Sequence, residues 1–536
     1  QYKITIPHVF VYNIELRGKD YIQVKQRDSS IHATEREGSG AGGVSKDFTV
    51  SAQETTFISR NLPAIRQDES YCWCPEDYKV QVSFDLQGTQ FTPNEYKPYS
   101  QKWEDVDKQL LKPENIQFGE HLSLTNPFRP ETKQAYNSEM NFEEKIICAF
   151  QVLKKKMAWN GRYQLYSKEL EKVIKKGSGS NADLNFILIS ILKDFGLEAY
   201  PVVMSRRSSG MLPYNFPSLQ KLNTFFVAIH DINKQKYVFL DSSMDVPAFN
   251  ILPLELSVNK ARMLSLKEKE EKKWVNVMAL SHNKSFMKID ARIEGNQVKG
   301  HRSTILYGQE AIEYQANENH KQDNLVSNPE NKVSQKEKLT VTNLKVKKQE
   351  NDWALIEEEF DFVLQADRTD DHLYINPMLF PQLKSNPFIQ TERVLPIEFP
   401  YPYKFTMLST LTLPEGYEVE ELPQSQSIRS EGDGLQCKYM IQQQGNTILL
   451  NYVFHLKGYI FLSEQYKQLQ ELWAKVIEKN NALIVPVYTN DPFQPPHPET
   501  KDMPGIRSVL CPYLPKSAHT AGMCTGYSQG CQFRYR

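Results

Sequence analysis

A glycine- and serine-rich turn leads directly into an apolar helix and holds the residues whose spacing best suits chemistry. The turn reads Gly177-Ser-Gly-Ser-Asn-Ala-Asp-Leu-Asn185, and the apolar run after it ends at Gly196. The start of a helix favours an anion because its free N–H groups and its dipole point there, so a thiol at that place would be held as thiolate. The turn offers Ser180 and Asn181 instead. An amide is not a nucleophile and a serine needs a positioned base, so both are also interpreted simply as helix caps.

Cysteine, the other nucleophile to consider, is sparse in this chain. The seven cysteines show no disulfide framework; they are Cys72, Cys74, Cys148, Cys437, Cys511, Cys524 and Cys531. Cys72-Trp73-Cys74 lacks the second pair of ligands that a metal site needs. Cys148 falls within a predicted helix, on its apolar side, where a small packed hydrophobe is the better interpretation. We therefore expect neither a metal nor a cofactor.

The elements around the turn predict an α+β arrangement. Residues 142–158 and 184–195 carry apolar side chains at helical spacing. Three strand-like runs follow and cover 199–204, 225–229 and 237–240. Helices followed by antiparallel strands are typical of an α+β domain. This reading places the turn at the start of a buried helix, beside a sheet.

Both flanks of this central part are rich in predicted strands. Period-two alternation marks residues 78–86, and long strand candidates cover 354–364 and 447–454. Two segments are predicted to be loops: 38–43, which is rich in Gly and Ser, and 317–338, which is rich in Asn. The charged run 267–273 is predicted to be an exposed linker or helix end. Residues 486–536 are predicted to be an irregular tail and hold three of the cysteines.

The turn, the helix and the strands together resemble the transglutaminase-like superfamily, which implies a papain-like α+β core. Active members of that family carry a Gly-x-Cys-x-Asp turn, a histidine after an Asn at a strand start, and an aspartate at the end of the next strand. With Asp183 aligned to that turn, the cysteine position holds Asn181, and the histidine position after Asn223 holds Thr224. The orienting aspartate is kept as Asp241. The resemblance therefore implies a degenerate catalytic site in which only the orienting acid is retained.

Motifs outside the turn extend the resemblance over roughly residues 55 to 485. Trp159-Asn-Gly161 matches the tripeptide that precedes the catalytic helix in the family. The flanking motifs resemble the β-domains of unknown function 3857 and 3858 that surround the core in many bacterial proteins; they are Phe57–Ile65, Glu69–Tyr71, Val82–Phe84 and Trp103–Val106 before it, and Asn386–Phe388, Glu392–Arg393, Pro396–Phe399, Pro414–Tyr417 and Glu421–Pro423 after it.

This order of motifs implies four regions along the chain. A transglutaminase-like core at 131–275 would lie between an N-terminal β-rich domain at 1–130 and a C-terminal β-rich region at 276–485. We expect the β-rich regions to be β-sandwiches, with one or two of them in the C-terminal region. The irregular tail would cover 486–536.

Charge and hydropathy argue against two classes of partner. The chain has 64 Lys and Arg against 65 Asp and Glu, a formal net charge of −1, and this balance argues against nucleic acid as a general partner. No apolar stretch approaches the roughly 18 residues that a transmembrane helix needs. The sequence starts without Met, which permits a trimmed and exported chain, and bacterial members of the family are usually exported. We therefore expect a periplasmic or cell-surface location.

Three functions stay open at this point. The first is a catalytically inactive binding or scaffold module, with a peptide, protein or glycan in the ancestral cleft or with the cleft closed as core. The second is an active cysteine-protease or transglutaminase-type acyl transferase that uses other residues, with Ser180, Cys148 and His230 as candidates. The third is a structural β-domain assembly at a cell surface. An open groove around Asn181 and Thr224 would favour binding, and a filled one would favour a spacer.

Overall fold

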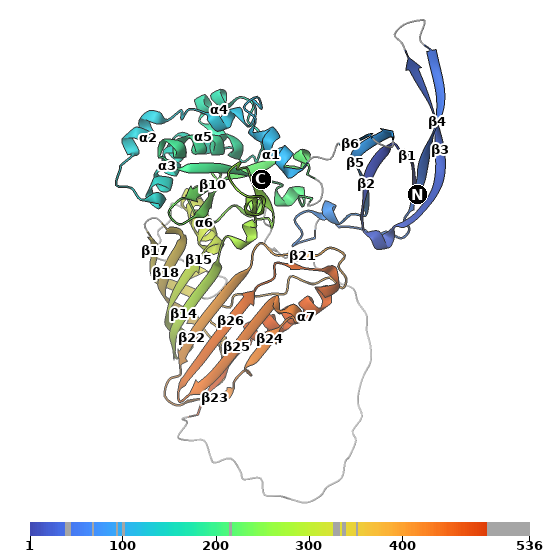
Figure 1. The fold of residues 1–536 in the computed structure, drawn as a ribbon. Helices are drawn as coiled ribbons and strands as arrows, with labels where there is room; N and C mark the ends of the chain where they lie inside the picture. Colours follow the sequence, from blue (N-terminus) through green and yellow to red (C-terminus); the bar gives the residue numbers. More distant parts are fainter. Residues whose placement is uncertain are drawn as a thin grey trace, which may run out of the picture. The chain divides into compact units, whose positions relative to one another are not determined.

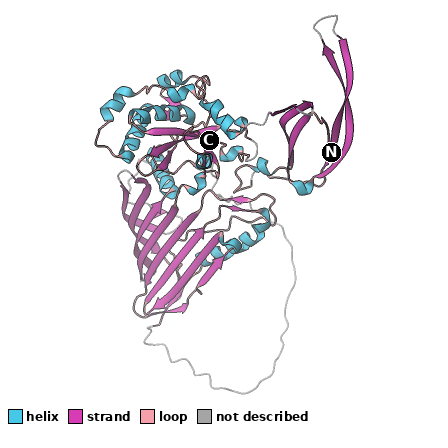
Figure 2. Ribbon diagram, viewed as in Figure 1, coloured by secondary structure: helices cyan, strands magenta, loops and turns pink. Residues whose placement is uncertain are grey.

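The computed structural model describes residues 1–37, 44–66, 69–92, 95–98, 102–213, 217–324, 333–334, 339–349 and 352–489. It divides into two compact units, Gln1–Asn490 and Asp491–Arg536, of which the second lies outside the described residues. The first unit is rich in strands (Figures 1 and 2). Its α-helices are α1 (Trp103–Leu111), α2 (Arg129–Ala135), α3 (Phe142–Lys156), α4 (Leu170–Lys176), α5 (Asn181–Asp194), α6 (Gln309–Asn324) and α7 (Tyr466–Asn480).

The N-terminal strands form two small antiparallel sheets. One has the order β1-β4-β3, with β1 at Tyr2–Pro7, β3 at Gln23–Glu37 and β4 at Val44–Ile58. The other has the order β2-β5-β6, with β2 at Phe10–Arg17, β5 at Gln81–Thr92 and β6 at Glu95–Pro98. The rings of Phe57 and Phe84 meet edge to face at 6.0 Å and join the two sheets. The predicted strand over 78–86 is confirmed from Gln81 onward, after a 3-10 turn at Pro75–Tyr78.

Two capped helices form the centre of the helical part. In α3, the Asn141 side chain accepts from Glu144 N and the Glu144 carboxylate accepts from Asn141 N, which closes a reciprocal cap. In α5, Ser180 and Asp183 form the same cap, so the helix begins at Asn181, three residues before the predicted start. It ends next to Gly196, whose φ of +74° suits the left-handed residue after a helix.

Helix α5 packs on one face of a five-stranded sheet with the order β11-β10-β9-β12-β13. The strands are β9 (Glu198–Met204), β10 (Thr224–Asp231), β11 (Lys236–Leu240), β12 (Ala261–Met263) and β13 (Trp274–Val275), and every pairing is antiparallel. This confirms the three predicted strands. Side chains alternate across the sheet. Phe225 faces the helices, where its ring lies 4.8 Å from that of Phe186, whereas Phe226 packs with Phe239 in a separate cluster.

The C-terminal β-rich part is built on one nine-stranded sheet. Its order is β16-β17-β18-β15-β14-β22-β26-β25-β24. The strands are β14 (Asn283–Glu294), β15 (Gln297–Tyr307), β16 (Val333–Ser334), β17 (Leu339–Gln349), β18 (Asp352–Gln365), β22 (Tyr403–Thr412), β24 (Gln426–Arg429), β25 (Leu435–Gln444) and β26 (Thr447–Leu456). The parallel pairing of β14 with β22 joins the two halves, so the predicted strands over 354–364 and 447–454 are confirmed within a single sheet.

Smaller elements complete the unit. A four-stranded sheet has the order β19-β20-β28-β23, formed by Asp367–Thr369, His372–Tyr374, Val485–Tyr488 and Tyr417–Glu421. Two-stranded sheets are formed by β7 (Ala158–Trp159) with β8 (Ser178–Gly179) and by β21 (Ile397–Glu398) with β27 (Ile460–Phe461). Helix α7 contributes Trp473, whose ring stacks at 5.5 Å on Phe399 in the core of this part.

Two segments differ from the predictions for irregular structure. Helix α6 reaches Asn324, so the predicted loop over 317–338 was wrong in its first part. The helix starts where it does because Gly308 turns the chain at a φ of +75° and the Asn283 side chain accepts from Gln309 N. Strand β28 takes up the beginning of the predicted tail, whereas residues 490–536 and the predicted loop 38–43 lie outside the described residues.

The charged run 267–273 is largely solvent-accessible, as predicted, except for its last residue, Lys273, which is buried in an ion cluster. The Lys273 Nζ lies 3.1 Å from Asp107 Oδ2 on α1. The same carboxylate binds Arg262 of β12 through two hydrogen bonds, of 2.6 and 2.7 Å. Arg262 also pairs with Glu270 at 2.6 Å. A local run of charges predicts a solvated surface. Lys273 is buried because α1, which is distant in the sequence, packs against it and supplies Asp107 as its partner.

Candidate functional site

The turn before α5 is held by a neighbouring segment and by close packing. Residues Ala158–Trp159 pair in parallel with Ser178–Gly179, and Asn160 N donates to Gly179 O at 2.9 Å. Gly179 leaves no room for a larger residue, since a Cβ there would lie 2.5 Å from a methyl carbon of Val173. The Trp159-Asn-Gly161 tripeptide and the Gly-Ser-Gly turn therefore lie side by side, and together they fix where α5 begins.

Asn181 lies at the first position of α5 and is fully buried. Its Nδ2 donates to Thr224 Oγ1 at 2.8 Å and to the Phe225 carbonyl at 3.0 Å. Its Oδ1 accepts from Gln164 N at 2.9 Å. Asn181 and Thr224 are 43 positions apart in the sequence and are brought into direct contact, with both side chains completely shielded from solvent.

Asp241 is held by a second asparagine one turn further along the same helix. The Asn185 Nδ2 donates to Asp241 Oδ2 at 2.9 Å and to the Phe225 carbonyl at 2.8 Å. Its Oδ1 accepts from the N and the Oγ of Ser242, at 3.0 and 2.6 Å. Asp241 Oδ1 in turn accepts from both the N and the Oγ of Ser243. Sequence reasoning did not select Asn185, although its position four residues after Asn181 puts both amides on one face of the helix.

Electrostatically, the site is a buried carboxylate held by neutral donors. Burial raises the pKa of Asp241, and the hydrogen bonds from Ser243 and Asn185 oppose that rise. Lys154 Nζ approaches from α3 and donates to the Ser242 carbonyl at 3.3 Å. Burial lowers the pKa of Lys154, against the attraction of Asp245 and Asp241.

Ser180 and His230 are not arranged for nucleophilic catalysis. The Ser180 hydroxyl donates to Asp183 Oδ2 at 2.7 Å and accepts from Asp183 N, so it serves as the cap of α5. His230 lies at the opposite end of β10 from Thr224, as the register shows: Thr224 pairs with Met204, and His230 with Glu198. Its ring stacks at 4.8 Å on Tyr237. Neither residue therefore belongs to a pair of nucleophile and base.

Burial raises the pKa of every cysteine thiol in the described part of the chain, which disfavours the thiolate. The pKa rises to about 12 for Cys72 and to about 11 for Cys437, and it is also raised for Cys74 and Cys148. The Cys148 thiol donates to the Ala135 carbonyl at 3.6 Å. No group of three or more His, Cys, Asp or Glu side chains that could hold a metal occurs among the residues described here.

The Cys72-Trp73-Cys74 segment has structural partners instead. Trp73 N donates to Glu398 Oε2 at 2.9 Å, and Tyr78 OH donates to Glu398 Oε1 at 2.6 Å. The Arg207 guanidinium lies 4.3 Å from the centre of the Trp73 ring, and it donates to the carbonyls of Phe399 and Pro400 at 2.7 and 2.8 Å. The segment thus ties the loop after β9 to the C-terminal β-rich part.

Comparison with solved structures gives two distant likenesses. The first is a crystal structure named "putative protease" from Parabacteroides distasonis ATCC 8503, with 12% identity and a TM-score of 0.46, covering 90% of this chain and 71% of that one. The second is named "putative cysteine protease" and comes from Cytophaga hutchinsonii, with 11% identity and a TM-score of 0.17, covering 46% of this chain and 75% of that one. Likenesses at this level assign no activity to the chain.

Sequence comparison gives one family match. No curated protein matches the chain. Within the part of the chain that the structure describes, no helix is long and apolar enough to cross a membrane. The N-terminal β-domain and the transglutaminase-like core stay predictions, but the predicted C-terminal domain is confirmed. Residues 371–485 match the family model described as "Domain of Unknown Function with solved-structure structure (DUF3858)".

Proposed function

We propose that this chain is a transglutaminase-like protein with a papain-type core that has lost acyl transfer and serves as a scaffold or binding module. The observation that carries the proposal is the Asn181 side chain. The sequence resemblance aligns it with the family's nucleophile. The side chain is fully buried and uses its amide to bind Thr224 Oγ1 at 2.8 Å and Gln164 N at 2.9 Å. A covalent mechanism needs a nucleophile with an adjacent base, and this pair supplies neither.

The bonds around Asn181 suit a structural role. In an active site of this class, a thiol and an imidazole would exchange a proton across the gap between α5 and β10. Here the amide of Asn181 and the hydroxyl of Thr224 span the same gap with a fixed hydrogen bond. Asp241, the proposed remnant of the orienting acid, accepts from Asn185 and Ser243 instead of a histidine. A fully satisfied polar network of this kind stiffens a core.

Solvent exclusion supports the closed-core form of the proposal over an open ancestral cleft. Asn181 and Thr224 are 0% exposed, and Asp241 is 1% exposed. A peptide or glycan could reach them only if α5 separated from β10. We therefore place any partner binding on the β-rich regions, within the proposed arrangement of N-terminal β-domain, transglutaminase-like core and DUF3858 domain.

A cysteine-directed assay tests the loss of activity. The full chain would be incubated with a glutamine-containing peptide and a fluorescent amine, and in parallel with an iodoacetamide probe under native conditions. We expect no amine incorporation, no peptide hydrolysis, and slow labelling of the half-buried Cys72, Cys74 and Cys148 and of the buried Cys437. Turnover that disappears in one cysteine variant, such as Cys148→Ser or Cys72→Ser, with an unchanged circular dichroism spectrum, would overturn the proposal.

A further inference from the structure

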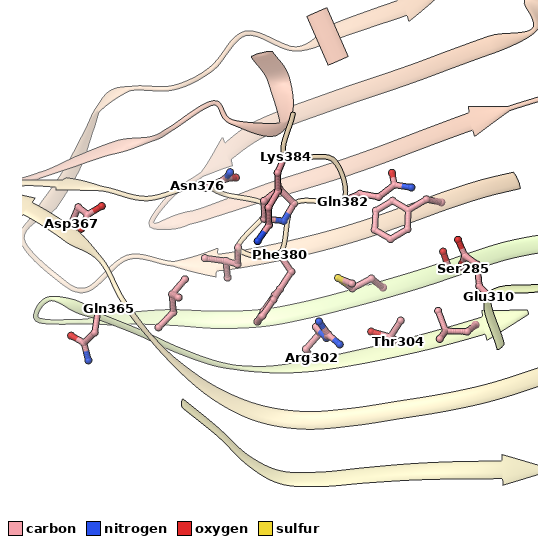
Figure 3. A pocket seen from close by; sticks show the side chains of 16 residues that line it. Ser285, Arg302, Thr304, Glu310, Gln365, Asp367, Asn376, Phe380, Gln382 and Lys384 are labelled. Carbon is pink, nitrogen blue, oxygen red and sulfur yellow. The ribbon is translucent and has the colours of Figure 1, made fainter. Parts of the chain in front are cut away.

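A cavity of about 760 Å³ lies on one face of the nine-stranded sheet, between the sheet and the segment that runs from Asn376 to Lys384 (Figure 3). Ser285 and Met287 of β14 and Arg302, Thr304 and Leu306 of β15 line its floor. These side chains share one face because alternate residues of a strand point the same way. Its apolar lining includes Met287, Leu306, Leu379, Phe380 and Phe405. The volume is in the range of small-molecule sites.

Three buried polar atoms of the lining residues have no hydrogen-bond partner among the described residues. They are Arg302 Nε, Thr304 Oγ1 and Gln382 Oε1. Thr304 is 5% exposed, so bulk water does not satisfy its hydroxyl. Buried polar atoms are rarely left unpaired, and each unpaired one costs about 1–3 kcal/mol. Three such atoms around one cavity are groups that a bound ligand can satisfy by hydrogen bonding.

The side chains that present these atoms are already held in place. The Arg302 guanidinium lies 4.2 Å from the ring centre of Phe360 and 4.8 Å from that of Phe380, and it pairs with Glu358. The Gln382 Nε2 donates to Tyr403 OH at 2.7 Å, which leaves its Oε1 as the unused group. Fixed side chains reduce the entropic cost of binding. The cavity therefore has the rigid polar groups and apolar walls of a built site.

Charge at the cavity is balanced. The charge of Arg302 is matched by Glu358. Lys384 and Asp367, of opposite sign, both line the cavity. Burial raises the pKa of Glu310, which shifts this carboxyl toward its neutral form. Apart from Glu310, the charged side chains of the lining are thus matched in sign, and this balance favours a neutral ligand that both donates and accepts hydrogen bonds.

The position of the cavity disfavours an extended peptide. Peptides that join a sheet do so at an edge strand, where backbone groups are free. Strands β14 and β15 lie in the interior of the nine-stranded order, and both of their edges are already paired. Recognition here must come from side chains on the face of the sheet.

We propose that this cavity binds a neutral carbohydrate of one or two sugar rings. A sugar hydroxyl both donates and accepts, so it can donate to Gln382 Oε1, accept from Arg302 Nε, and do either with Thr304 Oγ1. The C–H face of a sugar ring suits the apolar walls at Phe405 and Met287. The site goes beyond the proposed function and does not depend on the loss of catalysis, because it shares no residue with the network around Asn181.

Binding is tested on the full chain with neutral sugars. N-acetylglucosamine, galactose, maltose and cellobiose would each be titrated into the protein and followed by isothermal calorimetry and by ligand-observed NMR. We expect saturable binding of at least one of them. Binding of none of these sugars to the folded chain would overturn the proposal, as would binding of a tetrapeptide probe to the same residues in place of the sugars.

Variants separate recognition from folding. Thr304→Val keeps the side-chain shape and removes an unpaired hydroxyl, so we expect Tm to stay unchanged or rise while sugar affinity falls about 5- to 10-fold, the worth of one hydrogen bond. Gln382→Leu should weaken binding by a similar factor. Thr342→Val on the exposed side of β17 is the matched control and should leave affinity unchanged. Unchanged affinity in both cavity variants would overturn the assignment.

Discussion

The Nδ2 of Asn181 lies 2.8 Å from Oγ1 of Thr224, and this bond ties the first turn of α5 to the first residue of β10. Both partners are fully buried. The same helix face carries Asn185, which bonds to Asp241 and to the Phe225 carbonyl. The two asparagines therefore act as a pair of amide clamps between the helix and the sheet.

Removing the first clamp should destabilise the fold. Asn181→Ala leaves Gln164 N without its acceptor and removes a donor to Thr224 Oγ1, in a region closed to water. We expect the free energy of unfolding to fall by about 1–3 kcal/mol, as measured by urea denaturation. Asn233→Ala, in the exposed turn between β10 and β11, is the control and should change it by less than about 0.5 kcal/mol. Equal effects of both changes would contradict the clamp.

A thiol introduced at the same position should report that the site is closed. In Asn181→Cys, we expect iodoacetamide to modify the new thiol only as fast as the protein opens, because the native side chain has no exposure. Mass spectrometry of the digested protein distinguishes this thiol from the natural cysteines. Asn233→Cys should react at once. Rapid labelling at both positions would show an open cleft and would remove the basis for a closed core.

The buried carboxylate should give stability an unusual pH dependence. Burial raises the pKa of Asp241 in the folded state, so the folded chain holds this proton more tightly than the unfolded chain does. Its contribution to stability is therefore full below the unfolded pKa, about 3.9, and is lost as pH rises through the folded pKa. Relative to Asp241→Asn, which does not titrate, the wild type should lose stability across that window. Urea denaturation of both proteins, from acidic to neutral pH, measures the difference in their free energies of unfolding. A difference that does not change with pH would contradict the prediction.

The ion cluster around Asp107 should be strongly coupled. Asp107→Ala leaves Arg262 and Lys273 without their shared carboxylate, and the Arg262 and Asp107 side chains are almost entirely buried. Breaking a buried pair in this way costs about 3–5 kcal/mol, so we expect a large loss of stability in a thermal or urea melt. Lys108→Ala, exposed on the same helix, should be nearly neutral. The Asp107→Ala, Arg262→Met double variant should recover part of the loss, and a further drop would contradict the coupling.

Several helices and strands could be predicted from the sequence because the patterns that define them extend over only a few residues. The apolar periodicity of 142–158 and 184–195 predicted α3 and α5, and the strand patterns predicted β9, β10 and β11. Ser180 and Asn181 were both interpreted as helix caps. The structure confirms Ser180 as the cap of α5, whereas Asn181 is the first helical residue and its amide binds Thr224 and the Phe225 carbonyl. The start of α6 was missed, because it depends on Asn283, which reaches Gln309 from 26 positions away. Lys273 was misjudged for the same reason, since its partner Asp107 is 166 positions distant.

The sequence by itself determined which chemistry is possible: Asn181 and Thr224 carry an amide and a hydroxyl, and no arrangement of the chain turns them into a thiol and a base. Side-chain identity sets that limit, because nucleophilicity belongs to the functional group. Only the tertiary structure decided that these groups face each other in a closed core, and that Arg302, Thr304 and Gln382 meet around a cavity. Solvent access and unpaired polar atoms arise from packing between segments distant in the sequence, and no local pattern records them.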